Sequence, residues 1–251
     1  RRSAERRRRR HRGPAPPLPY PLWLDYGRDN YAGVTWSNIP ESDGRRLFLG
    51  WMNNWDYGNM IPTQNFRGAM TLPRELRLAN NGLHMVVASF PVREVGDEKE
   101  GTPIIMNQLA EESFPIGADY YNNGYVLSFT IKPNGLSMFD FALQNSKGEK
   151  IIFAFDTNQK TFVVNRSQSG LSDFSSNFAK PLIKAPLTKK DSYTIHMWVD
   201  KASTEVFING GEVVQTNIVF PTEPYNQLKF DLRGNTAISV ENITLYKVKH
   251  D

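Results

Sequence analysis

The chain of 251 residues is long enough for one large or two modest domains, and a hydrophobic fraction of 39% allows a sizeable core. It has no cysteine, which excludes disulfides, and no apolar run of 18 residues, so we expect no membrane partner. The net charge of +4 divides into +7 for residues 1–19, with eight arginines and one glutamate, and −3 for residues 20–251. Residues 20–251 have a net negative charge and no stripe of basic residues, so they would not attract a nucleic acid. We therefore expect no nucleic-acid partner.

Residues 1–19 differ abruptly from the rest of the chain, because they are rich in arginine and proline and almost free of apolar side chains. Such a segment cannot bury enough surface to offset the entropy lost on ordering, and we predict that it is disordered. No apolar stretch follows its charges, so it does not have the pattern of a secretory signal peptide. A real basic arm and an artefact of gene assignment both stay open as explanations, and we favour the second.

Residues 20–92 predict a small antiparallel sheet, because strand-forming residues alternate between clusters of turn residues. The pattern predicts strands at 31–37, 45–52, 68–72, 75–78 and 83–90. Asn80-Asn81-Gly82 is a hairpin signal before the last of them. Strands of these lengths are typical of one β-propeller blade, and one blade does not close a propeller.

The remainder of the chain is predicted as a linker and a second all-β domain. Residues 93–119 are acidic and then polar, and we predict a surface linker there. Residues 120–251 contain short strands at near-regular spacing, separated by Asn-Gly and other turn signals, which is typical of an antiparallel β-sandwich. The expected fold class is therefore all-β, with a partial propeller segment followed by a sandwich.

The segment Leu47–Tyr57 changes abruptly from an apolar strand to a run of amides, an acid and aromatics. Aromatic faces can stack on the apolar side of a sugar ring, while amides and acids bind its hydroxyls. The polar run that follows Met52 consists of Asn53, Asn54, Trp55, Asp56 and Tyr57. A strand that ends in an ordinary polar turn would explain the same pattern.

The sequence offers few groups for catalysis. Its four histidines are scattered without metal-ligand spacing, so we expect no metal site, and no glycine loop for phosphate or Gly-x-Ser-x-Gly nucleophile turn is present. Carboxylates remain, and retaining glycoside hydrolysis needs two of them about 5 Å apart. The candidates are Asp25, Asp29, Asp56 and Glu75. Their spacing in the sequence does not show that any two carboxylates lie side by side in the fold. A turn or surface position explains each of these acids equally well.

Several separated motifs resemble glycoside hydrolase family 32, which comprises levanases, inulinases, invertases and related fructan enzymes. They are Leu24-Asp-Tyr-Gly-Arg-Asp-Asn-Tyr-Ala32, Trp36-Ser-Asn-Ile-Pro40, Arg45-Arg-Leu-Phe-Leu-Gly-Trp-Met-Asn-Asn-Trp55, Ile61-Pro-Thr63, Pro73-Arg-Glu-Leu76 and Asp200-Lys-Ala-Ser-Thr-Glu-Val-Phe207. Their order and spacing look most like the bacterial levanase and exo-inulinase branch. The resemblance implies a five-bladed propeller followed by a β-sandwich, with residues 20–92 as the last blade and residues 120–251 as the sandwich.

The resemblance also implies a retaining mechanism whose catalytic residues this chain lacks. The family carries its nucleophile in Trp-Met-Asn-Asp-Pro, its transition-state stabiliser in Arg-Asp-Pro and its acid/base in Glu-Cys, and none of the three occurs here. Trp51-Met-Asn-Asn54 imitates the first motif, but Asn54 is an amide where an acid is required. We therefore expect the C-terminal part of a β-fructosidase without catalytic residues or a cofactor. A non-catalytic carbohydrate-binding or domain-stabilising module is the alternative.

Some substrate contacts are implied even so. Asp25 and Arg28 resemble an acid and a base that contact substrate in some members, and Trp55, next to Asn54, resembles an aromatic that lines the fructose pocket. The alternatives are a turn acid, a surface base and an edge aromatic. We expect Trp36 and Trp51 to lie in the core.

The expected partners are a fructan or sucrose, with self-association through the incomplete propeller. The parent family suggests a secreted or periplasmic location. Two sequons, at Asn165 and Asn242, permit glycosylation only in a secretory pathway.

Overall fold

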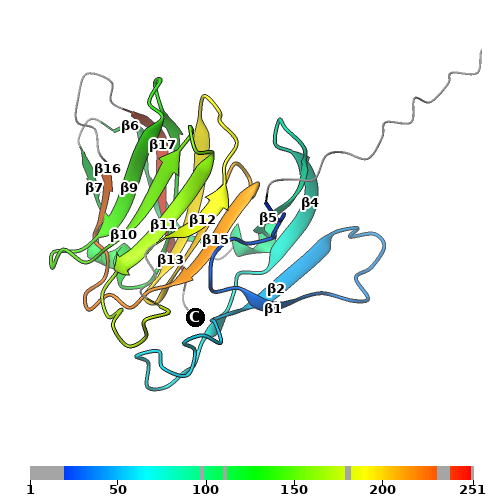
Figure 1. Cartoon of the computed structure of the whole chain (residues 1–251), viewed down its shortest axis with the longest axis horizontal. Helices are drawn as coiled ribbons and strands as arrows, with labels where there is room; N and C mark the ends of the chain where they lie inside the picture. The colour runs from blue at the N-terminus through cyan, green and yellow to red at the C-terminus, as the bar shows by residue number, and fades with distance from the viewer. Residues whose placement is uncertain (1–19, 97–98, 110–111, 179–181, 231–237, 250–251) are drawn as a thin grey trace, which may run out of the picture.

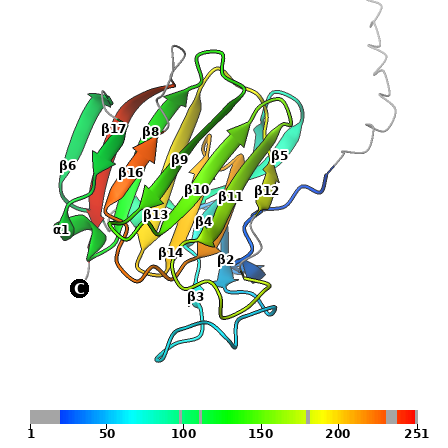
Figure 2. The ribbon, with the colours of Figure 1, turned by 60° about the vertical axis from the view of Figure 1, so that its left-hand side comes forward.

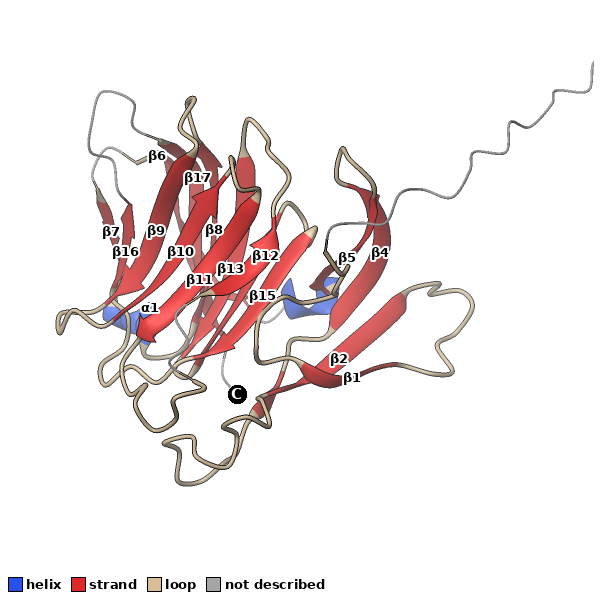
Figure 3. Ribbon diagram, viewed as in Figure 1, coloured by secondary structure: helices blue, strands red, loops and turns tan. Residues whose placement is uncertain are grey.

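The computed structural model describes residues 20–96, 99–109, 112–178, 182–230 and 238–249, which form three antiparallel sheets (Figures 1 and 3). The predicted disorder of residues 1–19 lies outside the described residues. Two short helical turns, η1 (Arg93–Gly96) and α1 (Ala118–Tyr121), are the helices of this part of the chain. Within the described residues no helix is long and apolar enough to cross a bilayer.

The first sheet contains the strands predicted for residues 20–92. Its order is β1-β2-β4-β5, and the short β3 pairs with β2. The strands are β1 (Tyr31–Thr35), β2 (Arg46–Met52), β3 (Ala69–Met70), β4 (Arg74–Asn80) and β5 (Met85–Pro91). The β4–β5 turn forms because the Asn81 side chain accepts the Leu83 and His84 N–H groups while Gly82 takes a φ of +98°.

The other two sheets contain six strands each and pack face to face as a β-sandwich (Figure 2). One has the order β12 (Ile183–Pro186), β11 (Thr161–Gln168), β10 (Lys150–Asp156), β9 (Met138–Gln144), β16 (Gln227–Phe230) and β7 (Ser113–Pro115). The other has the order β15 (Val213–Ile218), β14 (Ser203–Ile208), β13 (Tyr193–Asp200), β8 (Tyr125–Lys132), β17 (Ser239–Val248) and β6 (Lys99–Gln108). The all-β fold class is confirmed.

Part of the sandwich core follows from the alternation of buried and half-buried residues along strands such as β10 and β11. In β10 and β11 every second residue is fully buried, because successive side chains point to opposite faces of a sheet. The inward positions of neighbouring strands then stack: ring centroids lie 4.9 Å apart for Phe141 and Phe153, and 4.7 Å apart for Phe139 and Phe155. This aromatic layer belongs to a core cluster that comes mainly from the sandwich strands and also includes Tyr26.

Two strands occur where the sequence predicts a linker. Within residues 93–119, β6 pairs with β17 and β7 pairs with β16, so both belong to the sandwich sheets. Each partner strand lies more than 100 residues away, and such long-range pairing leaves little local signal in a polar segment.

Exposed apolar residues gather in the first sheet and the loops around it. Among the described residues 18 large hydrophobic residues are exposed; 13 of them lie within residues 20–92, and all five residues of β1 are exposed. The expectation that Trp36 lies in the core is wrong, because its side chain is 40% exposed; Trp51 is half-buried. Trp36 directly follows the exposed edge strand β1, whereas the contacts of the sheet with β15 of the sandwich come from β2 and β5.

The β14–β15 turn contacts β5 so closely that one glycine should be indispensable there. Gly211 has a φ of +87°, and a Cβ atom on it would lie 2.2 Å from the Ser89 carbonyl oxygen; Gly210 has a φ of +67° with open space around it. Gly210→Ala should cost about 1–2 kcal/mol of strain, and Gly211→Ala should cost about 1–3 kcal/mol more because of the clash. Urea unfolding of both variants measures the difference, and equal losses would contradict this close approach.

Candidate functional site

The structure brings together three of the four predicted site residues. The Arg28 guanidinium pairs with Asp56 at 2.6 Å, and the Asn54 side-chain amide donates to the Arg28 carbonyl at 2.7 Å. The Asn54 side-chain oxygen accepts the Asp56 N–H at 2.9 Å. The turn after β2 is therefore tied to the chain before β1, across 26 to 28 positions in sequence.

Trp55 lies in the same turn and is 67% exposed. Its ring centroid is 5.1 Å from that of Trp51, and Trp51 lies 6.4 Å from Tyr31 on the neighbouring strand β1. The three rings form a contiguous aromatic cluster, and Trp55 directly precedes Asp56 of the Arg28–Asp56 ion pair in the chain. An open aromatic face next to charged hydrogen-bonding groups is chemically suited to a sugar ring. We call Arg28, Asn54, Trp55 and Asp56 the rim.

Asp25, the fourth predicted residue, lies beside the rim with its carboxylate buried. Its two oxygens accept hydrogen bonds from five protein groups: the Gly27 N–H, the Asn30 amide, the Arg74 guanidinium, and the Thr216 N–H and hydroxyl. Burial alone would raise the pKa of Asp25, but the charge of Arg74 and these hydrogen bonds hold the pKa below its usual value. Asp25 is thus an ionised structural acceptor, and a substrate contact by Asp25 stays a prediction.

A second buried cluster next to the rim was missed by the sequence analysis. The Arg166 guanidinium contacts the Asp29 carboxylate at 2.5 Å and donates to the Tyr57 hydroxyl at 2.7 Å, while Tyr57 donates to Asp29 at 2.5 Å. Burial raises the pKa of Tyr57, so the phenol stays protonated and able to donate. The signal was present in the sequence, because Arg166 is in phase with the inward residues Phe162 and Val164 of β11.

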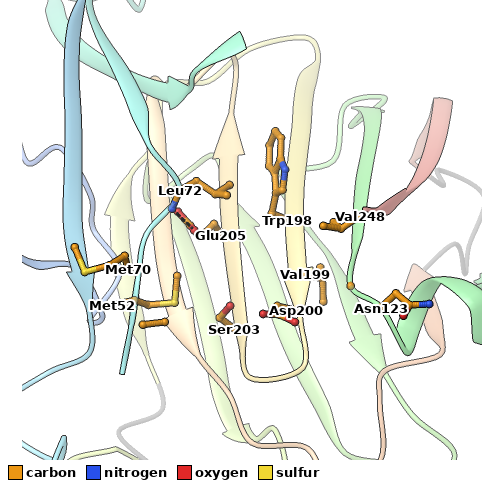
Figure 4. Close-up of a pocket in the computed structure, with 12 residues that line it drawn as sticks. Met52, Met70, Leu72, Asn123, Trp198, Val199, Asp200, Ser203, Glu205 and Val248 are labelled. Atoms are coloured by element: carbon orange, nitrogen blue, oxygen red, sulfur yellow. Dashed lines mark hydrogen bonds between the residues drawn. The ribbon is translucent and has the colours of Figure 1, made fainter. Parts of the chain in front are cut away.

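A cavity of about 180 Å³ lies between the first sheet and the sandwich (Figure 4). Met52, Met70 and Leu72 line one side, and Trp198, Ser203 and Glu205 line the other (Figure 4). Glu205 is buried there, and burial raises its pKa against the opposing charge of Arg74. Its oxygens accept the Leu72 N–H at 2.8 Å and pair with Arg74 at 2.5 Å, so the carboxylate is held by protein groups.

Three acids in or beside the first sheet lack the raised pKa that a general acid needs near neutral pH. Arg45 holds the pKa of Asp43 and of Glu94 at about 2, and Arg77 lowers the pKa of Glu75. Within the described ranges no cluster of three or more His, Asp or Glu side chains could hold a metal ion.

Comparison with known proteins places the chain in a family. Residues 13–89 match the sequence model of the glycosyl hydrolases family 32 N-terminal domain, and residues 98–247 match that of the family 32 C terminal. The levanase of Bacillus subtilis (strain 168) is 34% identical over 238 residues, which cover 91% of this chain and 34% of the levanase. The extracellular exo-inulinase of Aspergillus awamori is 29% identical over 233 residues, covering 90% and 42% respectively.

Solved structures agree on the fold. The crystal structure of the Aspergillus awamori exo-inulinase has a TM-score of 0.73 and 25% identity, covering 90% of this chain and 44% of that one. The β-fructofuranosidase of Schwanniomyces occidentalis has a TM-score of 0.74 at 21% identity, covering 90% and 49%, and shows the fold alone. The chain spans about a third to a half of the length of these relatives. With both family 32 models matched in order along it, the chain belongs to glycosyl hydrolase family 32.

Proposed function

We propose that this chain is the C-terminal part of a β-fructosidase-type glycoside hydrolase that acts on a fructan or on sucrose. The supporting observation is the consecutive match of residues 13–89 and 98–247 to the two family models. The first sheet is the last blade of the propeller, with residues 93–98 as its boundary to the sandwich. The catalytic carboxylates of a retaining mechanism are supplied from outside these 251 residues.

In this proposal the rim contacts a fructosyl unit. Trp55 supplies the stacking face, and Arg28 and Asn54 bind hydroxyl groups, directly or after exchange of the Arg28–Asp56 pair. Asp25 holds the segment that carries Arg28 in place through its hydrogen bonds with the Gly27 N–H and with Thr216. The observation in favour of this arrangement is the exposed ring of Trp55 beside an ion pair that is open to solvent.

A non-catalytic module that binds carbohydrate or stabilises another chain is the second candidate. It is favoured by four arginine-paired acids of residues 20–96, namely Asp25, Asp43, Glu75 and Glu94, whose pKa values are all lowered. The DNA sequence upstream of the Leu24 codon separates the two candidates. Finding Trp-Met-Asn-Asp-Pro, Arg-Asp-Pro and Glu-Cys there in the same reading frame supports the enzyme, and a frame without them supports the module.

We also propose that the chain self-associates through the first sheet. Leu78 and Val87 face each other directly on β4 and β5 and are 75% and 40% exposed. Burying such a pair between two copies is favourable, so the sedimentation coefficient should rise with protein concentration. The double variant Leu78→Lys/Val87→Lys should remain monomeric, while Met138→Lys, which alters an exposed residue of the sandwich, should behave like the parent chain. A parent chain that stays monomeric at the highest concentration reached would contradict the proposal.

A further inference from the structure

The free edge of β15 is covered by a segment that is not itself a strand. Among the described strands β15 pairs only with β14, yet all six of its residues are buried. Residues 25–29 run along the open side, where the Tyr26 N–H donates to the Val214 carbonyl at 2.8 Å and the Asp29 N–H donates to the Thr216 carbonyl at 3.3 Å. Figure 1 shows this N-terminal segment, in blue, beside β15.

The two N–H groups on the same edge bind carboxylates instead of peptide carbonyls. The Thr216 N–H donates to Asp25 at 3.0 Å, and the Ile218 N–H donates to Asp29 at 2.9 Å. Four consecutive outward-facing groups of β15 are thereby paired. Two aspartate side chains stand where a neighbouring strand would place its carbonyl groups.

The sequence Asp25-Tyr-Gly-Arg-Asp29 permits this arrangement because its central residue is a glycine. A Cβ atom on Gly27 would lie 2.1 Å from the Thr216 carbonyl oxygen, so no other residue allows the segment to lie so close to β15. Unlike the side chains of Asp25 and Asp29, which bind β15, the side chain of Arg28 points to Asp56 at the rim.

Asp25 and Asp29 each form a buried ion pair with an arginine from another element of the fold. Arg74 of β4 pairs with Asp25 at 2.8 Å and with Glu205 of β14 at 2.5 Å. Arg166 of β11 pairs with Asp29, and its guanidinium lies 4.0 Å from the Phe178 ring centroid. The side chains of both ion pairs are at most 4% exposed, so neither charge is compensated by solvent.

We propose that residues 25–29 form a carboxylate clasp, in which Asp25 and Asp29 cover the open edge of β15. The clasp also joins the first sheet to the sandwich, so that the two unfold as one cooperative unit. The clasp blocks the pairing of β15 with strands of other molecules, which an open edge would invite. It also fixes the backbone of Arg28 between two anchored residues, and this holds whether or not the rim binds a sugar.

Amide hydrogen exchange by NMR on the full chain tests the clasp. Asparagine keeps the shape of aspartate but has one acceptor oxygen, so it cannot satisfy the donors that meet both oxygens of Asp25 or Asp29. We expect exchange at Thr216 to accelerate by about 10-fold or more in Asp25→Asn, and exchange at Ile218 to do so in Asp29→Asn. The control Asp56→Asn alters an exposed acid paired with Arg28 and should leave both amides within about 3-fold of the parent chain.

The parent chain itself provides a second measurement in case the variants do not fold. A closed edge requires the Thr216 and Ile218 amides to exchange as slowly as those of β14, whereas the amides of the exposed edge strand β1 should exchange fast. Exchange of Thr216 and Ile218 at the rate of β1 would overturn the proposal. Equal effects of Asp56→Asn and the two clasp variants would overturn it as well.

Discussion

Fructose should not be released from sucrose, inulin or levan above a buffer blank when the purified chain is the only enzyme present. A retaining glycosidase needs a nucleophile and an acid/base that flank the glycosidic bond. In this chain Asp25 and Asp29 are paired with buried arginines, and Asp56 is paired with Arg28. Glu205 has a raised pKa but is held by Leu72 and Arg74. Fructose release that disappears when one of these acids is replaced would contradict this expectation.

A chimeric protein tests whether activity returns when the missing catalytic residues are supplied. We expect hydrolysis when the part of the Bacillus subtilis levanase that precedes the matched region is joined to residues 20–251, because that part would supply the missing carboxylates. The junction leaves the clasp intact. Replacing Trp55 by alanine in the chimera should raise KM because the stacking face is lost, and the loss of binding free energy should be about 0.5–1.5 kcal/mol. A folded chimera without activity would count against the proposed enzyme.

Replacing Arg74 by methionine should lower the free energy of unfolding by about 3–5 kcal/mol. The Arg74 side chain is fully buried and pairs with Asp25 and Glu205, so its loss leaves two carboxylates without a cation away from solvent. Arg77 provides a matched control because it lies on the same strand and pairs with Glu75, but its side chain is 71% exposed. Arg77→Met should cost less than about 1 kcal/mol. Urea denaturation of both variants gives the comparison.

A rescue experiment separates charge from packing at Arg74. The triple variant Arg74→Met, Asp25→Asn, Glu205→Gln has no unpaired charge in the cluster, and it should recover part of the stability that Arg74→Met loses. If Arg74→Met lowered the free energy of unfolding as little as Arg77→Met, the pairing of Arg74 with Asp25 and Glu205 would make no net contribution to stability. If the triple variant recovered nothing, the loss would come from packing instead.

Much of the fold was predictable from the sequence because its signals are local. Alternation placed strands near β10 and β11, and the Asn80-Asn81-Gly82 turn placed the β4–β5 hairpin. The family motifs then supplied the two-part architecture that periodicity alone does not specify. β6 was missed because its partner β17 is remote in sequence and because Lys99–Gln108 begins with polar residues. Trp36 was wrongly expected in the core, since aromatic character does not reveal which face of a sheet is covered.

The candidate site was predictable only as a set of residues. The motifs singled out Arg28, Asn54 and Trp55, and the structure adds that Asp56 links Arg28 to Asn54. The role of Asp25 depends on Thr216, 191 positions away, so no local pattern reveals it. Arg166 had a weak signal, an arginine in an inward phase, but its partner Asp29 could not be identified from spacing.

The pairing of Asp29 with Arg166 also couples the evolution of the first sheet to that of the sandwich, although the two differ in architecture. The two residues are separated by 137 positions and belong to opposite sides of the module boundary. A replacement at one of them leaves a buried charge alone until the other changes, so substitutions at the two positions should covary among relatives that keep the clasp. Natural recombination between the blade and the sandwich is constrained for the same reason, because a crossover at residues 93–98 succeeds only when both parents carry compatible residues at positions 29 and 166.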